Sequence, residues 1–90
     1  MPKFVIERKM PGVGQLTPQE LKSASQTSCG VLNSMGPGIQ WIHSYVTDDL
    51  IYCIYSAADE NTVRRHAELA GFPANKVSQV RSVIEPVTAE

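Results

Sequence analysis

The side chains that could do chemistry in this chain are few and scattered. There are two histidines, His43 and His66, and two cysteines, Cys29 and Cys53. No HxH, HExxH or CxxC spacing occurs, and these are the spacings by which metal sites are usually recognised. Imidazole together with oxygen ligands suits nickel, copper or zinc. A site built from His43 or His66, a carboxylate and a partner chain is therefore chemically feasible.

The two cysteines give no sign of a reactive site. No adjacent residue marks either thiol as activated, and no Ser-His-Asp or Cys-His nucleophile can be assembled from neighbouring residues. With only two cysteines, we expect Cys29 and Cys53 to be buried free thiols in a reducing cytoplasm. The alternative is a disulfide between them.

The first half of the chain predicts a strand followed by a helix. "KFVIERKM" (3–10) alternates in a β-branched context, as strands do. After "PGVG", Thr17 serves as N-cap, Pro18 takes the first helical position and Glu20 completes a capping box. This helix ends at Gly36. Gly30 inside it costs about 1 kcal/mol relative to alanine, so we expect a close packing contact there.

The second half predicts a hairpin, a helix and a last strand. "IQWIHSYV" (39–46) and "LIYCIYSA" (50–57) are strands joined by the turn formers "TDD". A second helix begins after Asp59 and ends at Gly71. The last strand is expected in "VSQVRSVIEPV" (77–87), ended by Pro86.

The element order β-α-β-β-α-β is that of an α+β, ferredoxin-like fold. Residues 1–90 form one domain in which two helices cover one face of a four-stranded antiparallel sheet. The other face is left open. We expect it to be buried against the open face of a second copy, giving a homodimer with a shared barrel-like interior.

Alternation along the strands assigns aromatic and ionisable side chains to the open face. Phe4 and Ile6 suit the side of the sheet that the helices cover. One self-consistent assignment of the strand faces then places a cavity on the open side. Tyr52 or Tyr55 joins this cavity, and we favour Tyr52. The cavity residues are Glu7, Trp41, Tyr45, Tyr52, Arg81 and Glu85, with His43 beside them. The alternative is an ordinary dimer interface in which Glu7 or Glu85 pairs with Arg81.

His66, on the second helix, is predicted to face the protein core. At 100° per residue, Val63, Ala67 and Ala70 mark the buried stripe, and His66 falls inside that arc. A buried imidazole needs partners for its nitrogens, such as a tyrosine hydroxyl, a carboxylate or a metal ion. A purely structural histidine is the alternative to a metal ligand.

Charge and hydropathy exclude several classes. Eight basic and nine acidic residues give a net charge of −1, without the basic stripe that nucleic-acid binding requires. No apolar run approaches the roughly 20 residues of a membrane span. The N-terminus lacks the apolar region of a signal peptide, so a cytoplasmic location is expected.

Three blocks carry a family resemblance: "KFVIERKMPGVGQLTPQEL", "IQWIHSYVTDDLIYCIY" and "HAELAGFPANKVSQVRSVIEPVTAE". They resemble small bacterial proteins grouped under a domain-of-unknown-function heading and named for a nickel-binding member. The resemblance implies a ferredoxin-like subunit, a homodimer of the dimeric α/β-barrel kind and a capacity to bind nickel. It favours His66, which lies in a matching block, as a metal ligand over His43.

The leading hypothesis is therefore a cytoplasmic, homodimeric protein that binds nickel or a similar divalent ion through histidine and carboxylate. The alternative is a small-molecule binder, or an enzyme without a cofactor, that uses the open-face cavity. A structural or regulatory module is a third class that the sequence leaves open.

Overall fold

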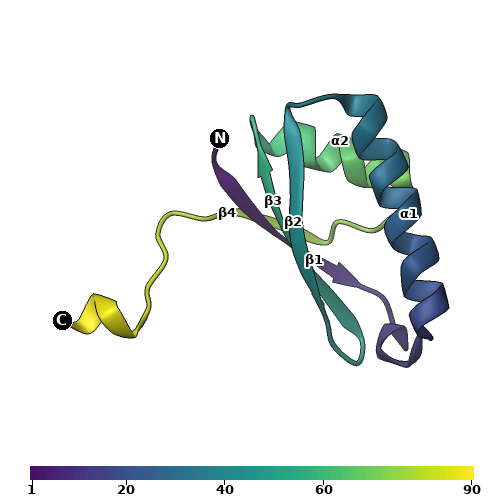
Figure 1. Ribbon diagram of the computed structural model, residues 1–90, viewed down its shortest axis with the longest axis horizontal. Coiled ribbons are helices and arrows are strands. Elements are labelled where there is room, and N and C mark those ends of the chain that lie inside the picture. Colours follow the sequence, from purple (N-terminus) through teal and green to yellow (C-terminus); the bar gives the residue numbers. More distant parts are fainter.

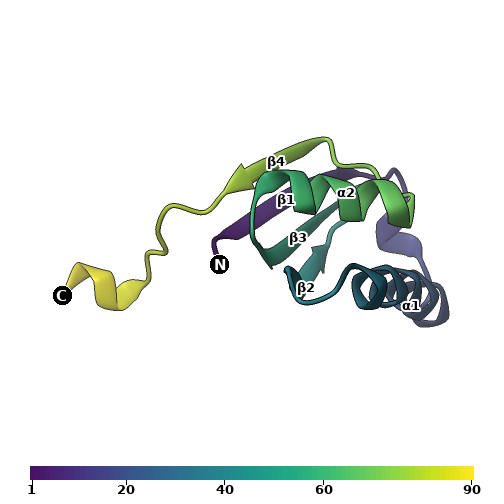
Figure 2. The ribbon, with the colours of Figure 1, turned by 90° about the horizontal axis from the view of Figure 1, so that it is seen from above.

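The computed structural model describes residues 1–90 and has the predicted element order. The strands are β1 (Lys3–Lys9), β2 (Ile39–Val46), β3 (Leu50–Ala57) and β4 (Lys76–Gln79). The helices are α1 (Pro18–Met35) and α2 (Glu60–Ala70), with short 3-10 turns η1 (Val13–Gln15) and η2 (Pro86–Ala89). Both helices lie on one side of the sheet (Figures 1 and 2). The ferredoxin-like α+β fold is confirmed.

The sheet is antiparallel throughout, with strand order β2-β3-β1-β4. β1 lies in the middle, with Phe4 opposite Tyr55 and Ile6 opposite Cys53 on β3. These four side chains are buried on the helix side, so the predicted inward direction of Phe4 and Ile6 is confirmed. Ile39, Ala57 and Val63 complete this core.

Both helices begin as the sequence predicts. Thr17 accepts a hydrogen bond from the Glu20 amide, and the Glu20 carboxylate accepts one from the Thr17 amide, which closes the capping box. On α2 the Asp59 side chain accepts hydrogen bonds from the Thr62 hydroxyl and the Thr62 amide, and these two bonds lower the pKa of the Asp59 carboxyl. Gly71 ends α2 with φ 76°, in the left-handed region that favours glycine.

Gly14, rather than Gly30, is the glycine that a close contact requires. A Cβ on Gly14 would lie 2.7 Å from the Thr47 carbonyl oxygen, because the η1 turn packs against the β2–β3 turn. A Cβ on Gly30 would meet nothing within 4 Å. The expected packing contact at Gly30 is therefore wrong, and that residue is exposed on the outer side of α1.

The last strand is shorter than predicted. β4 ends at Gln79, although the alternating pattern continues to residue 87. The Val80 amide donates to the Lys3 carbonyl, at the first residue of β1. The residue before Lys3 is Pro2, which has no amide to donate and whose carbonyl accepts from the Ala57 amide, so the pairing with β4 stops and the chain leaves the sheet. Residues 81–90 form an exposed C-terminal segment that extends away from the body (Figure 1).

A bulge in β2 changes the face of one predicted cavity residue. Trp41 lies opposite Tyr55, but His43 lies opposite Ile54, the very next residue back along β3. Ile42 is therefore the extra residue of the bulge, and such an insertion shifts the two-residue alternation by one. Trp41 faces the helices, whereas His43 and Tyr45 face away. The prediction that Trp41 lies on the open face is wrong for this reason.

Candidate functional site

The open face of the sheet carries a row of oxygen donors across three strands. Glu7 on β1 lies opposite Tyr52 on β3, and Tyr52 lies opposite Tyr45 on β2. Directly opposed side chains in antiparallel strands have their Cβ atoms about 4.5–5.5 Å apart. His43 joins the end of this row, with its Nε2 atom 3.1 Å from the Tyr45 hydroxyl. We call Glu7, His43, Tyr45 and Tyr52 the open-face cluster.

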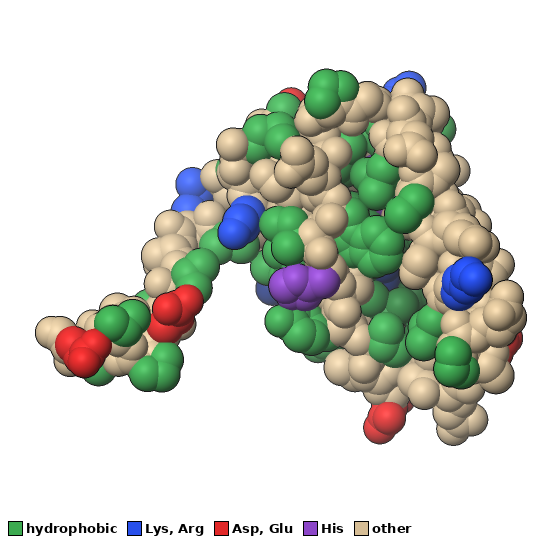
Figure 3. Space-filling view, viewed as in Figure 1, with side chains coloured by type: hydrophobic (Ala, Val, Ile, Leu, Met, Phe, Trp, Pro, Cys, Tyr) green, Lys and Arg blue, Asp and Glu red, His purple; other side chains and the backbone are tan.

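The open-face cluster is accessible and has one aromatic contact within it. His43 and Tyr45 are exposed, and their rings meet edge to face with centroids 4.9 Å apart. Glu7 and Tyr52 are half-buried. The space-filling view shows a histidine surrounded by hydrophobic side chains on the face that carries β2 (Figure 3). Tyr52 is thus the tyrosine that joins Tyr45, and Tyr55 lies on the other face.

Arg81 and Glu85 do not reach the open-face cluster within one protomer. Both lie in the exposed C-terminal segment beyond β4, where the Glu85 amide donates to the Thr88 hydroxyl. Of the predicted cavity residues, Glu7, Tyr45 and Tyr52 therefore lie together on the open face. Trp41 lies on the helix side instead, and Arg81 and Glu85 lie in the C-terminal segment. Arg81 pairs with neither glutamate in the single chain, whose one ion pair joins Arg64 to Glu60.

The two histidines lie on opposite faces of the sheet. His66, on α2, is fully buried on the helix side, so its predicted inward direction is confirmed. Its Nε2 atom lies 3.2 Å from the Ser28 hydroxyl of α1, and its ring packs against Tyr55. Within one protomer a single ion cannot bind both histidines, because the sheet separates them.

Burial lowers the pKa of His66, and the nearby positive charge of Arg8 lowers it further, although Ser28 opposes this shift. The imidazole is therefore neutral at neutral pH. Its Nδ1 atom is buried and has no hydrogen-bond partner.

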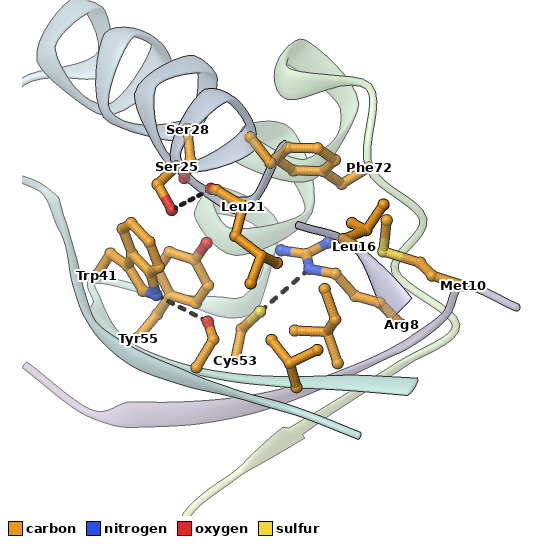
Figure 4. A pocket seen from close by; sticks show the side chains of 14 residues that line it. Arg8, Met10, Leu16, Leu21, Ser25, Ser28, Trp41, Cys53, Tyr55 and Phe72 are labelled. Atoms are coloured by element: carbon orange, nitrogen blue, oxygen red, sulfur yellow. Dashed lines mark hydrogen bonds between the residues drawn. The ribbon is translucent and has the colours of Figure 1, made fainter. Parts of the chain in front are cut away.

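A second site, which the sequence did not indicate, lies between α1 and the sheet. It is a pocket of about 90 Å³, and ten of its fourteen lining residues are hydrophobic. Figure 4 shows the Arg8 guanidinium and the Tyr55 hydroxyl pointing into this space beneath α1. We call it the helix-side pocket.

Arg8 is the one charged residue that lines the helix-side pocket. It is only 2% exposed, because alternation along β1 places it on the same buried side as Phe4 and Ile6. Its Nε atom donates to Cys53 Sγ at 3.4 Å and its Nη1 atom to the Pro73 carbonyl at 2.6 Å. The guanidinium also lies 5.7 Å from the centroid of the Phe72 ring. Its Nη2 atom is buried and has no partner.

Four hydroxyls also line this pocket, those of Ser25, Ser28, Ser44 and Tyr55. Burial raises the pKa of the Tyr55 phenol, as does the neighbouring Cys53, while the positive charge of Arg8 and polar interactions with Ser28 and Arg8 oppose the shift. The phenol therefore stays protonated and can donate. The Trp41 indole is held at the pocket wall by donating to the Ser44 hydroxyl at 2.9 Å.

The cysteines are both free, as expected. Cys53 is buried, as predicted, and it lies beside Arg8. Cys29 is exposed on α1, so its predicted burial is wrong. No three His, Cys, Asp or Glu side chains of the protomer lie close enough together to hold a metal ion. None of the helices combines the length and apolar character that a membrane span requires.

Comparison with known proteins supplies the family. The family model described as "Nickel responsive protein SCO4226-like" matches residues 4–80. The chain belongs to this SCO4226-like family. The match covers both helices and all four strands except the first residue of β1, and it ends where the chain leaves the sheet.

One solved structure supports the fold of this SCO4226-like protein. The crystal structure of SCO4226 from Streptomyces coelicolor A3(2) superposes with a TM-score of 0.76 at 21% identity, and the alignment covers 91% of this chain and 99% of that one. At this identity the likeness shows the ferredoxin-like fold alone. No curated protein matches the chain.

Proposed function

We propose that this member of the SCO4226-like family is a cytoplasmic, homodimeric protein that binds nickel, or a similar divalent ion, at the open sheet face. The observation that carries the proposal is the open-face cluster, which combines one imidazole, one carboxylate and two phenols on an accessible surface. Imidazole nitrogen with oxygen donors suits nickel, copper and zinc. The family description, which names nickel responsiveness, favours nickel among these.

The donor set fits a metal only if two copies contribute. One protomer offers His43 and Glu7 but no third histidine, cysteine or acidic side chain near them. Two open faces packed together would bring two imidazoles and two carboxylates to one interior. His43 and Glu7 are the residues that we assign to the ion, with Tyr45 and Tyr52 as hydrogen-bonding or additional oxygen groups.

Exposed apolar surface supports dimer formation. Tyr45 on the open face is 59% exposed, and the C-terminal segment exposes Val83, Ile84 and Val87 by 67%, 81% and 62%. Val83, Ile84 and Val87 lie within five residues of one another, and exposed large hydrophobic residues this close together are typical of interaction surfaces. We therefore expect the open face and the C-terminal segment to pack on a second copy.

His66 is the weaker candidate ligand. Its Nε2 atom already contacts Ser28, and neither Asp nor Glu lines the pocket on that side of the sheet. A role for His66 would need the Nδ1 atom, which lies inside the core. The two histidines are therefore best tested separately.

The test is calorimetric titration of tag-free protein with Ni²⁺, together with its molar mass from light scattering. We expect a dimer that binds nickel, with affinity falling at least about tenfold in His43→Ala and in Glu7→Gln. His66→Asn serves as the comparison on the far face and should bind as the wild type does. A monomer, or unchanged nickel affinity in the His43→Ala, Glu7→Gln double variant, would refute the proposal.

A further inference from the structure

We propose that the helix-side pocket is a binding site for a small monocarboxylate, whose charged group pairs with Arg8 and whose short apolar part lies against α1 and the sheet. This site is separate from the proposed nickel site, because it lies on the other face of the sheet.

The argument begins with a buried positive charge that has no counterion. Arg8 is 2% exposed, and no carboxylate of the chain pairs with it, since the one ion pair is Arg64 with Glu60. An ionised group buried without a partner costs several kcal/mol. The guanidinium cannot avoid this free-energy cost by losing its proton, because arginine stays protonated in proteins. An anion that enters the pocket would remove the penalty.

Arg8 lines the pocket and has a hydrogen-bond donor that no acceptor of the chain satisfies. Guanidinium has five N–H donors, and Cys53 and the Pro73 carbonyl accept from Nε and Nη1. Nη2 is left buried and without a partner, in a residue that lines the pocket. Planar carboxylate oxygens are the acceptors that such a guanidinium edge binds best.

Two hydroxyls can complete the recognition of the anion. Tyr55 and Ser28 both line the pocket, and the raised pKa of the Tyr55 phenol keeps its proton available for donation. When the His66 Nε2 atom carries the proton and donates to Ser28, the Ser28 hydroxyl is free to donate to a ligand. The neutral state of His66 adds no second charge, so the site carries a single positive charge and suits a monoanion.

The size and lining of the pocket determine how large and how apolar the rest of the ligand is. At roughly 10–15 Å³ for each water-sized position, a volume of about 90 Å³ accepts about six to nine non-hydrogen atoms. Apolar side chains form most of the wall, among them Leu16, Leu21, Val46, Ile51 and Trp41. A sulfate or phosphate ion would leave this wall facing water, whereas an aliphatic acid of four to seven carbons would cover it.

The experiment uses sodium hexanoate, which has eight non-hydrogen atoms, hexanamide, a neutral compound of the same size, and sodium sulfate. Each is titrated into metal-free, full-length protein in the presence of a chelator, and binding is followed by ¹H-¹⁵N NMR. We expect hexanoate to shift amides around Arg8, Ser28 and Tyr55, and to bind at least about tenfold more tightly than hexanamide. Hexanamide that binds equally well, or sulfate that binds more tightly than hexanoate, would overturn the proposal.

Variants locate the site. Arg8→Gln should weaken hexanoate binding at least about tenfold, and Tyr55→Phe about three- to tenfold. Ala24→Phe should block binding by filling the pocket while leaving Arg8 in place. Arg65→Gln removes an exposed charge on α2 and is the matched control, which should bind as the wild type does.

The set remains decisive if one variant fails to fold. NMR dispersion reports folding of each variant, and Tyr55→Phe and Ala24→Phe carry the test if Arg8→Gln is unfolded. Wild-type affinity in folded Arg8→Gln, or in folded Ala24→Phe, would refute the site. Because the measurement excludes metal and does not use the open face, its outcome is independent of the nickel titration.

Discussion

Gly30 and Gly14 offer opposite predictions for the same chemical change, glycine to alanine. Gly30 lies within α1, and a Cβ there would meet nothing within 4 Å. Its substitution therefore changes only helix propensity, for which glycine is about 0.8–1.0 kcal/mol worse than alanine. For a domain of this size, 1 kcal/mol corresponds to about 4–8 °C in Tm. We expect Gly30→Ala to raise Tm by about 3–8 °C.

Gly14→Ala should do the reverse. The added Cβ would lie 2.7 Å from the Thr47 carbonyl oxygen and 2.8 Å from the Asp48 Cα atom, both of which belong to the backbone. Backbone atoms cannot rotate aside as side chains do, so the η1 turn must move away from the β2–β3 turn. That movement also strains the hydrogen bond from the Gly14 amide to the Asp48 carbonyl. Overpacking of this kind costs about 1–3 kcal/mol.

The assay is thermal and urea unfolding followed by circular dichroism. All proteins are compared at one fixed concentration, because the proposed dimer would make Tm depend on concentration. An unchanged urea m-value would show that only stability has changed. A lower Tm for Gly30→Ala would refute the reasoning, since it would mean that another chain packs closely on the outer side of α1.

Two further predictions concern His66 and the C-terminal segment. Because the pKa of His66 is lowered in the folded state, the unfolded chain binds a proton below about pH 6.5 that the native protein does not. The free energy of unfolding should therefore fall as the pH drops below this value. Urea unfolding from pH 7.5 to 5.5 should show a smaller decline in His66→Phe than in the wild type or in His43→Gln, and equal declines would contradict the assigned neutral state. Deleting residues 81–90 removes exposed apolar side chains such as Ile84. Burying one such side chain contributes about 1.5–3 kcal/mol, so the dimer dissociation constant from analytical ultracentrifugation should rise at least about tenfold. An unchanged constant would show that the segment does not pack on the partner.

Much of the fold was predictable because its signals are local. The capping box at Thr17, the Asp59 cap and the Gly71 stop each act within a few residues, and they set the helix ends that the structure shows. The "TDD" turn acts in the same way, with the Thr47 amide donating to the Leu50 carbonyl. Alternation also placed Phe4 and Ile6 on the correct face.

The candidate sites were predicted only in part, because they depend on pairing between distant strands. Alternation brought Glu7, His43 and Tyr45 to one face, but it could not show the bulge at Ile42 that turns Trp41 to the helices. Nor could it show that β1 stops supporting β4 beyond Lys3, which removes Arg81 from the sheet. The bulge at Ile42 depends on how β2 pairs with β3, and the end of β4 depends on where β1 begins. Neither can be inferred from the residues of β2 or β4 alone.

The sequence by itself determined the order of elements, the helix limits, the hairpin and the inward direction of His66, because each follows from local capping, turn chemistry or periodicity. Only the tertiary structure decided that the two histidines lie on opposite sides of the sheet and that Arg8 lines a pocket without a counterion. The physical reason is that burial and charge pairing depend on residues far apart in the chain. Arg8 meets Cys53 and Pro73, which lie 45 and 65 positions away.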